Sequence, residues 1–204
     1  MAGAAQGVDE REVKLAVPEG FVMPALDQLA GVAVIDRGDV LLEAVYWDTT
    51  DLGLAGHGVG VRHRNGTWAF KGRSRRDGNA VVREELELGG PAQRIPDPIR
   101  ARIAPLVDVA RVHPVADVRT TRHTFDVSAD EQAVEVVHDR VSVHDGTAVR
   151  GRFEEVEVEY ANGSTALANR VVALLAGHGA TLDPTAKYVR ALRLLGHDPS
   201  PVSE

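Results

Sequence analysis

The chain has 204 residues, of which 44% are hydrophobic and 26% charged, so it can bury the core of a soluble domain. It contains no cysteine, which excludes disulfides, a thiolate metal site and a cysteine nucleophile. The net charge of −7 argues against a general nucleic-acid-binding protein, and no apolar run is long enough to cross a bilayer. The N-terminus lacks the pattern of a signal peptide. We therefore expect one cytoplasmic domain over residues 1–204, with a core at about 10–195 and flexible ends.

Alternation of polar and apolar residues, which is typical of half-buried strands, dominates the chain. It predicts strands at 10–17, 32–36, 39–48, 58–64, 67–73, 80–88, 115–127, 132–144 and 148–160. Helical patterns predict helices at 24–32, 97–106, 164–179 and 185–195. The third helix has the clearest pattern, because Ser164 can cap it and one apolar stripe contains Leu167, Val171, Leu174 and Leu175. Antiparallel strands with attached helices favour a barrel or a strongly curved sheet.

Ionic side chains repeat on one face of several predicted strands. In the segment EREVKLAV, Glu10, Glu12 and Lys14 alternate with Val13 and Leu15. The same alternation groups Arg62 with Arg64, Lys71 with Arg73, Arg83 with Glu85 and Glu87, and Glu155 with Glu157 and Glu159. A single face of this kind is ordinarily solvated, but three carboxylates in a row repel one another unless a cation or solvent relieves them.

A closed barrel would bring these charged faces together around a water-filled tunnel, with the apolar faces covered by helices outside. Such a tunnel is useful only if it binds a highly charged ligand. Its cations suit a polyanion, because guanidinium groups bind phosphate oxygens in a bidentate manner. Its glutamates suit a hard divalent cation, which takes oxygen ligands. The two signs together indicate a polyphosphate bound with Mg²⁺ or Mn²⁺.

These residues, taken in order, resemble the CYTH superfamily, the triphosphate tunnel metalloenzymes. The matching pieces are EREVK at 10–14 for the family's ExExK signature, the Arg62–Arg64 pair, FKG at 70–72, REELE at 83–87, Arg119 and Arg122, DR at 139–140, EVEVE at 155–159 and AKYVRAL at 186–192. The ordered set is more specific than ExExK alone and covers about residues 10–195. The resemblance implies an α+β fold, an eight-stranded antiparallel β-barrel that forms the triphosphate tunnel, with flanking helices.

The resemblance also implies roles for the charged residues. The implied metal ligands are Glu10, Glu12, Asp139, Glu155, Glu157 and Glu159. The implied substrate-binding cations are Lys14, Arg62, Arg64, Lys71, Arg83, Arg119, Arg122 and Lys187. The implied catalytic residues are Glu85, Glu159 and Lys187, and one of the two carboxylates would orient the attacking water.

These roles predict a divalent-metal-dependent triphosphatase whose substrate is inorganic tripolyphosphate. The surplus of Ala, Val, Gly, Arg and Asp over Lys, Asn and Ile suggests a bacterial source, and the charge and the lack of a long apolar run predict no nucleic-acid or membrane partner. Three alternatives remain open at this stage. The first is a thiamine- or nucleoside-triphosphatase, which has a larger leaving group. The second is a non-catalytic polyphosphate-binding module, against which the complete acidic set counts, and the third is an ordinary barrel with solvated charges. An adenylyl cyclase is disfavoured, because that branch of the family carries His-Phe before ExExK, where this chain has AAQGVD.

Overall fold

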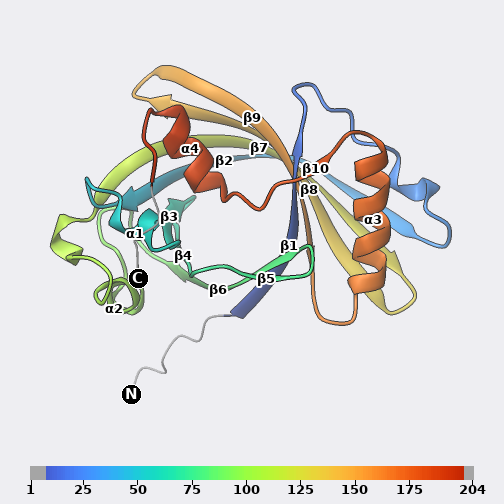
Figure 1. Cartoon of the computed structure of the whole chain (residues 1–204), viewed down its shortest axis with the longest axis horizontal. Coiled ribbons are helices and arrows are strands. Elements are labelled where there is room, and N and C mark those ends of the chain that lie inside the picture. The colour runs from blue at the N-terminus through green and yellow to red at the C-terminus, as the bar shows by residue number, and fades with distance from the viewer. Residues whose placement is uncertain (1–7, 200–204) are drawn as a thin grey trace.

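The chain folds in the computed structural model into a closed, eight-stranded antiparallel β-barrel (Figure 1). The structure describes residues 8–199, so most of the two predicted flexible ends lies outside the described residues. Around the barrel the strands follow in the order β1 (Val8–Val17), β9 (Ala148–Tyr160), β8 (Gln132–Asp145), β7 (His113–Ala129), β2 (Ala33–Asp48), β3 (Gly60–Arg64), β4 (Thr67–Lys71) and β6 (Ala80–Gly89). Pairing of β1 with β6 closes the ring. Two short strands pair with the barrel strands: β5 (Arg75–Asp77) pairs with β6, and β10 (Thr181–Leu182) pairs with β1.

Four α-helices accompany the barrel within the described residues. They are α1 (Gly53–Gly56), α2 (Asp97–Ile103), α3 (Thr165–Gly177) and α4 (Lys187–Leu194), and 3₁₀ turns lie at Leu26–Gln28 and Val109–Arg111. Figure 1 shows α3 and α2 outside the barrel on opposite sides of it. No helix in this part of the chain is long and apolar enough to span a membrane.

Apolar clusters beneath α2 and α3 cover the outer face of the barrel. Val171 and Leu175 of α3 pack in one cluster with Val158 of β9, and Ile99 of α2 packs in another with Trp68 of β4. All five side chains are buried. Because neighbouring residues of a strand point to opposite faces, these apolar contacts outside direct the alternate, charged residues to the inside of the barrel.

Helix α4 packs on the inner face of the barrel instead. Its Tyr188 and Leu192 lie in one apolar cluster with Tyr46 of β2 and Val141 of β8. Val141 is two residues from Asp139 and therefore shares its inward face, and Tyr46 and Tyr188 both line the internal cavity. The expectation that helices cover only the outside is therefore correct for α2 and α3 and wrong for α4.

All the predicted strands are present, with small shifts of their ends. The segments 32–36 and 39–48 form one strand, β2, which contains an irregularity at Gly38 (φ 75°). The predicted helix 24–32 is only a 3₁₀ turn, because the segment between Pro24 and Gly31 (φ 72°) is too short to propagate an α-helix. The short elements α1, β5 and β10 were not predicted, since each is too short to produce a periodic pattern.

Helix α3 begins at the predicted residue but is capped differently. Ser164 occupies the N-cap position, yet its hydroxyl accepts a hydrogen bond from Ala133 N at 3.1 Å, outside the helix. The Gln132 side chain replaces it, because its Oε1 accepts a hydrogen bond from Leu167 N at 3.0 Å. The turn before β8 therefore ties α3 to the barrel.

Candidate active site in the barrel

The barrel encloses a cavity of about 640 Å³. Eleven of the predicted site residues line it: Glu10, Lys14, Arg62, Arg64, Lys71, Arg83, Glu85, Arg122, Glu157, Glu159 and Lys187. Glu12, Asp139 and Glu155 lie directly behind this lining and are almost fully buried, with exposed fractions of 1%, 0% and 1%. The alternative of an ordinary barrel with solvated charges is therefore wrong.

Strand register explains why the acidic residues meet. β1 pairs with β9 so that Glu12 lies opposite Glu159 and Lys14 lies opposite Glu157. β8 pairs with β9 so that Asp139 lies opposite Glu155. Side chains of directly opposed residues lie on the same face of a sheet, so three strands deliver their carboxylates to one side of the cavity.

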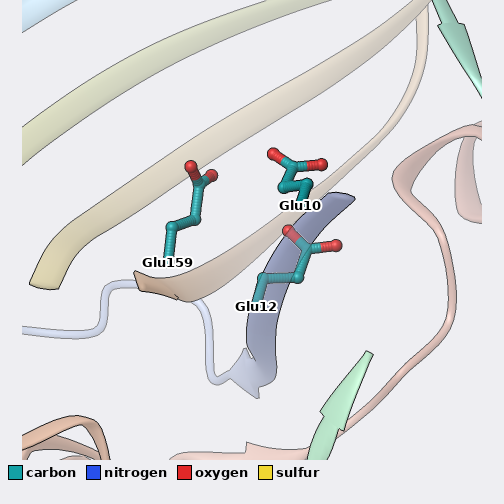
Figure 2. Close-up of side chains that lie close together, drawn as sticks. All are labelled: Glu10, Glu12 and Glu159. Carbon is teal, nitrogen blue, oxygen red and sulfur yellow. The ribbon is translucent and has the colours of Figure 1, made fainter. Parts of the chain in front are cut away.

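Glu10 and Glu12 of β1 and Glu159 of β9 form the first acidic cluster, with carboxylate oxygens within 4.8 Å of one another (Figure 2). Arg83 Nη2 lies 3.0 Å from Glu10 Oε2 and 2.8 Å from Glu12 Oε1. Glu12 Oε1 is nevertheless buried without a hydrogen bond of acceptable geometry. Glu159 forms no ion pair within residues 8–199, and burial, followed by the charges of Glu157 and Glu10, raises its pKa to about 8. Lys71 also pairs with Glu10 and Lys14 lies 4.0 Å from Glu12, but both are shared with other carboxylates, so this cluster has too little positive charge for its three carboxylates.

The donor set of this first cluster fits a divalent cation. Carboxylate oxygens are the ligands that Mg²⁺ and Mn²⁺ prefer, and a cation would relieve the mutual repulsion that raises the pKa of Glu159. It would also coordinate the buried Glu12 Oε1, which has an ion pair with Arg83 but no hydrogen bond of acceptable geometry. Glu10, Glu12 and Glu159 are thus the residues that would hold the ion.

The second acidic cluster, Asp139, Glu155 and Glu157, is instead filled with cations from the protein itself. Arg122 donates to Asp139 Oδ1 at 2.8 Å and to Glu157 Oε2 at 3.0 Å. Lys14 donates to Glu157, and Lys187 Nζ lies 3.1 Å from Glu155 Oε1. Burial disfavours the charged form of Glu157, but Lys14, Lys187 and Arg122 outweigh it and hold its pKa well below the usual range.

Arg62 and Arg64 of β3 form the least neutralised cationic surface of the cavity. Arg62 Nε is buried without a hydrogen-bond partner, and the nearest carboxylate oxygen, Glu87 Oε1, lies 3.6 Å from Arg62 Nη2. Arg64 forms no ion pair in the described part of the chain, and burial, followed by the charges of Arg62 and Arg122, lowers its pKa. Unsatisfied guanidinium donors of this kind are typical of an anion-binding surface.

Lys71 and Glu85 connect the cationic surface with the first acidic cluster. Lys71 Nζ donates to Glu85 Oε2 at 2.8 Å and to Glu10 Oε2 at 3.2 Å. Burial disfavours the charged form of Glu85, but hydrogen bonding with Glu10 and the charge of Lys71 outweigh it and lower its pKa. Glu85 is therefore ionised at neutral pH and can accept a hydrogen bond from water in the cavity.

Comparison with known proteins agrees with this arrangement. The family model described as the CYTH domain matches residues 9–187. The chain belongs to the CYTH family. Two solved structures share the CYTH fold at 16% identity. One, from Hippeastrum, is described as a candidate adenylyl cyclase with a dominant triphosphatase activity; it has a TM-score of 0.60 and covers 90% of this chain and 95% of its own. The other, a candidate adenylate cyclase from Bacillus halodurans, has a TM-score of 0.61 and covers 91% and 97%. No curated protein matches the chain.

One predicted site residue of this CYTH domain lies outside the cavity. Arg119 is 56% exposed and its Nε lies 3.4 Å from Glu43 Oε1 on the outer face of the barrel. Residues 119 and 122 are three apart, so they point to opposite faces of β7, and Arg122 takes the inward position. The structure therefore contradicts the predicted place of Arg119 in the tunnel.

Several residues that line the cavity of the CYTH domain or support its lining were missed by the sequence patterns. Asp48 is fully buried and accepts hydrogen bonds from Leu54 N at 2.8 Å and from the Tyr188 hydroxyl at 2.7 Å. Tyr188 in turn stacks on Tyr46, with ring centroids 4.8 Å apart. The matching segment AKYVRAL also contains Arg190, one helical turn after Lys187, and this spacing is the only signal that could have identified it.

Proposed function

We propose that this CYTH protein is a divalent-metal-dependent hydrolase of triphosphates, with inorganic tripolyphosphate as its substrate. One observation carries the proposal: a cationic surface with unsatisfied donors and an acidic cluster short of positive charge line the same cavity. A triphosphate with its cation supplies both missing partners at once. The dominant triphosphatase activity of the Hippeastrum relative supports the same reaction class.

In this proposal Glu10, Glu12 and Glu159 hold Mg²⁺ or Mn²⁺ beside the phosphate chain. When bound, the ion would neutralise negative charge that develops on phosphate oxygens. Phosphoryl transfer needs little covalent help, so the remaining residues act by positioning and by electrostatics.

The cations of the cavity bind the substrate. Arg62 and Arg64 hold one part of the phosphate chain through the donors that are now unsatisfied. Lys71 and Arg83 flank the first acidic cluster, and Lys14, Arg122 and Lys187 line the same cavity beside the second one. Lys187 stabilises charge on the leaving phosphate, and the ionised Glu85 orients the attacking water by accepting its hydrogen bond.

A thiamine- or nucleoside-triphosphatase is the second candidate function. Tyr46 and Tyr188 line the cavity and give it an aromatic wall, which an organic leaving group could contact. The complete set of carboxylates argues against a module that binds polyphosphate without hydrolysing it.

A substrate panel tests the proposal. Phosphate release from tripolyphosphate, thiamine triphosphate, ATP and pyrophosphate is measured with and without Mg²⁺, and cyclic AMP is measured in the ATP reactions. We expect tripolyphosphate to be hydrolysed with the highest kcat/KM, and only in the presence of the cation. Failure to hydrolyse any of the four substrates would refute the proposed activity, and faster hydrolysis of an organic triphosphate would select the second candidate.

A further inference from the structure

We propose that Arg190 is a positioning residue that docks α4 onto Asp139, Glu155 and Glu157, so that this second acidic cluster is an ion-pair socket for the helix and not a second metal site. The docked helix holds Lys187 in the cavity. The inference rests on the proposed function for what Lys187 does there, but the assignment of the socket comes from the contacts alone.

Arg190 bridges three parts of the molecule. Its Nη1 donates to Glu155 Oε2 at 3.2 Å, and its Nη2 lies 3.2 Å from Asp183 Oδ2, in the segment that leads into α4. Its guanidinium carbon lies 4.8 Å from the centre of the Phe153 ring, close enough for a cation–π contact. These contacts fix the helix relative to β9, because the two guanidinium nitrogens and the guanidinium plane are each restrained by a different partner.

Both carboxylate oxygens of Glu155 already have cationic partners. Its Oε1 lies 3.1 Å from Lys187 Nζ and 3.5 Å from Lys14 Nζ, and its Oε2 accepts from Arg190. The side chain is almost completely buried. A metal ion would have to displace buried cations that already satisfy the carboxylate, whereas the first cluster, with the unpaired Glu159, requires no such exchange.

The charges of the second cluster support the same assignment. Its three carboxylates are contacted by four cations, Lys14, Arg122, Lys187 and Arg190. In the first cluster, Arg83 and Lys71 pair with Glu10, and Arg83 and the more distant Lys14 (4.0 Å) pair with Glu12, whereas Glu159 has no ion pair within residues 8–199. A second divalent cation would therefore add positive charge to a group of side chains that already has an excess of it.

The rest of α4 is fitted to this position. Tyr188 donates its hydroxyl hydrogen to the buried Asp48 at 2.7 Å, which anchors the first turn. At the other end of the helix, a Cβ atom on Gly151 would lie only 2.7 Å from Leu194 Cδ2, so the glycine allows the helix to approach β9. Arg190 lies between these two anchors, three residues after Lys187.

Removal of the Arg190 charge should therefore displace Lys187 without removing a metal ligand. Glu155 Oε2 would lose its partner, and the freed carboxylate would attract Lys187 away from the substrate and repel phosphate oxygens. The expected loss is in substrate affinity. Binding of the metal ion alone should be unchanged.

The experiment compares Arg190→Gln with Arg193→Gln, a charge removal on the same helix. Arg193 is a matched control, because it is 56% exposed and its nearest carboxylate oxygen, on Asp198, is 3.9 Å away. In the substrate-free protein, Mn²⁺ titration by calorimetry should find one tight site in the wild type and in both variants. Hydrogen exchange of the α4 amides should become about tenfold faster in Arg190→Gln and stay unchanged in Arg193→Gln.

Kinetics supply the third readout. The KM for tripolyphosphate should rise about tenfold in Arg190→Gln, with a smaller change in kcat, because the lost interaction positions a substrate-binding group. The double variant with Glu155→Gln should recover part of this loss, since it removes the uncompensated carboxylate as well. A merely destabilising substitution would not be rescued in this way.

Two results would overturn the inference. One is a second tight Mn²⁺ site that Glu155→Gln abolishes, which would make Glu155 a metal ligand. The other is unchanged α4 exchange and KM in Arg190→Gln. Absence of turnover in the wild type would instead refute the proposed function, and the metal count and the exchange data would still test the socket.

Discussion

At the scale of single residues, Glu159 is the group whose titration should report on the first acidic cluster. Its pKa of about 8 in the folded chain exceeds the value of 4.5 for an unperturbed glutamate. The folded state therefore binds the proton more tightly than the unfolded state does, and stability must fall as the pH rises from 4.5 to about 8.

Glu159→Gln should remove this loss of stability in metal-free protein. The gain in unfolding free energy over wild type should grow by up to about 1.4 kcal/mol for each pH unit in that window. Denaturant unfolding in the presence of a chelator, at several pH values, measures the difference. Added Mg²⁺ should reduce the difference in unfolding free energy between the two proteins. If their unfolding free energies changed with pH in parallel, Glu159 would not lie in a repulsive cluster.

Arg62 permits a test of binding that is separate from turnover. We expect Arg62→Ala to weaken tripolyphosphate binding by about 1.5–3 kcal/mol, the usual contribution of a hydrogen bond to a charged group. Arg119→Ala is the control, because Arg119 lies on the outer face. Calorimetry should show weaker tripolyphosphate binding for Arg62→Ala only. Equal affinities of the two variants would mean that Arg62 does not bind the substrate.

At the scale of elements, the approach of α4 to β9 depends on a glycine. Gly151→Ala should cost roughly 1–3 kcal/mol of stability, because the added methyl group would lie 2.7 Å from Leu194 Cδ2. Gly89→Ala in β6 is the matched control, since nothing lies within 4 Å of a Cβ atom there. Thermal unfolding measures both, and Leu194→Ala should rescue the first. Equal losses of stability in the two alanine variants would mean that α4 does not pack closely against Gly151.

The strands were predictable from the sequence because one face of each contacts an apolar cluster and the other faces the charged cavity. This produces the alternation from Glu10 to Lys14 and from Glu155 to Glu159. The inward position of α4 was not predictable, because its alternating apolar and basic residues fit an outer helix equally well. Arg119 shows the same limit on a smaller scale: two arginines near one another in a strand do not share a face unless they are an even number apart.

The division of the carboxylates into two clusters also required the structure. The sequence groups Glu155, Glu157 and Glu159 on one strand face, but the register with β1 brings Glu159 to Glu10 and Glu12. Asp48 and Tyr46 are brought together with Tyr188 only because α4 folds back onto them. Contacts of such long sequence separation leave no local pattern.

At the scale of the whole molecule, the barrel is apolar outside, beneath α2 and α3, and charged inside. Burying this many charges is costly unless each has a partner, and the second cluster meets that condition while the first does not. The uncompensated sites, Glu159 on one side and Arg62 and Arg64 on the other, line one cavity. The unpaired buried charges therefore lower the stability of the unligated protein, and a metal ion and a polyanion would compensate them.

The most direct test of this account is a metal titration of tripolyphosphate hydrolysis by the wild type and by Glu12→Gln. Glu12 belongs to the first cluster and is not one of the three carboxylates of the socket of α4. We predict no phosphate release by the wild type after exhaustive chelation and full recovery with Mg²⁺ or Mn²⁺. Glu12→Gln should remain folded but need at least about tenfold more metal ion for half-maximal activity, as expected when a ligand is lost. Turnover that survives chelation, or an identical metal requirement in the two proteins, would contradict the account.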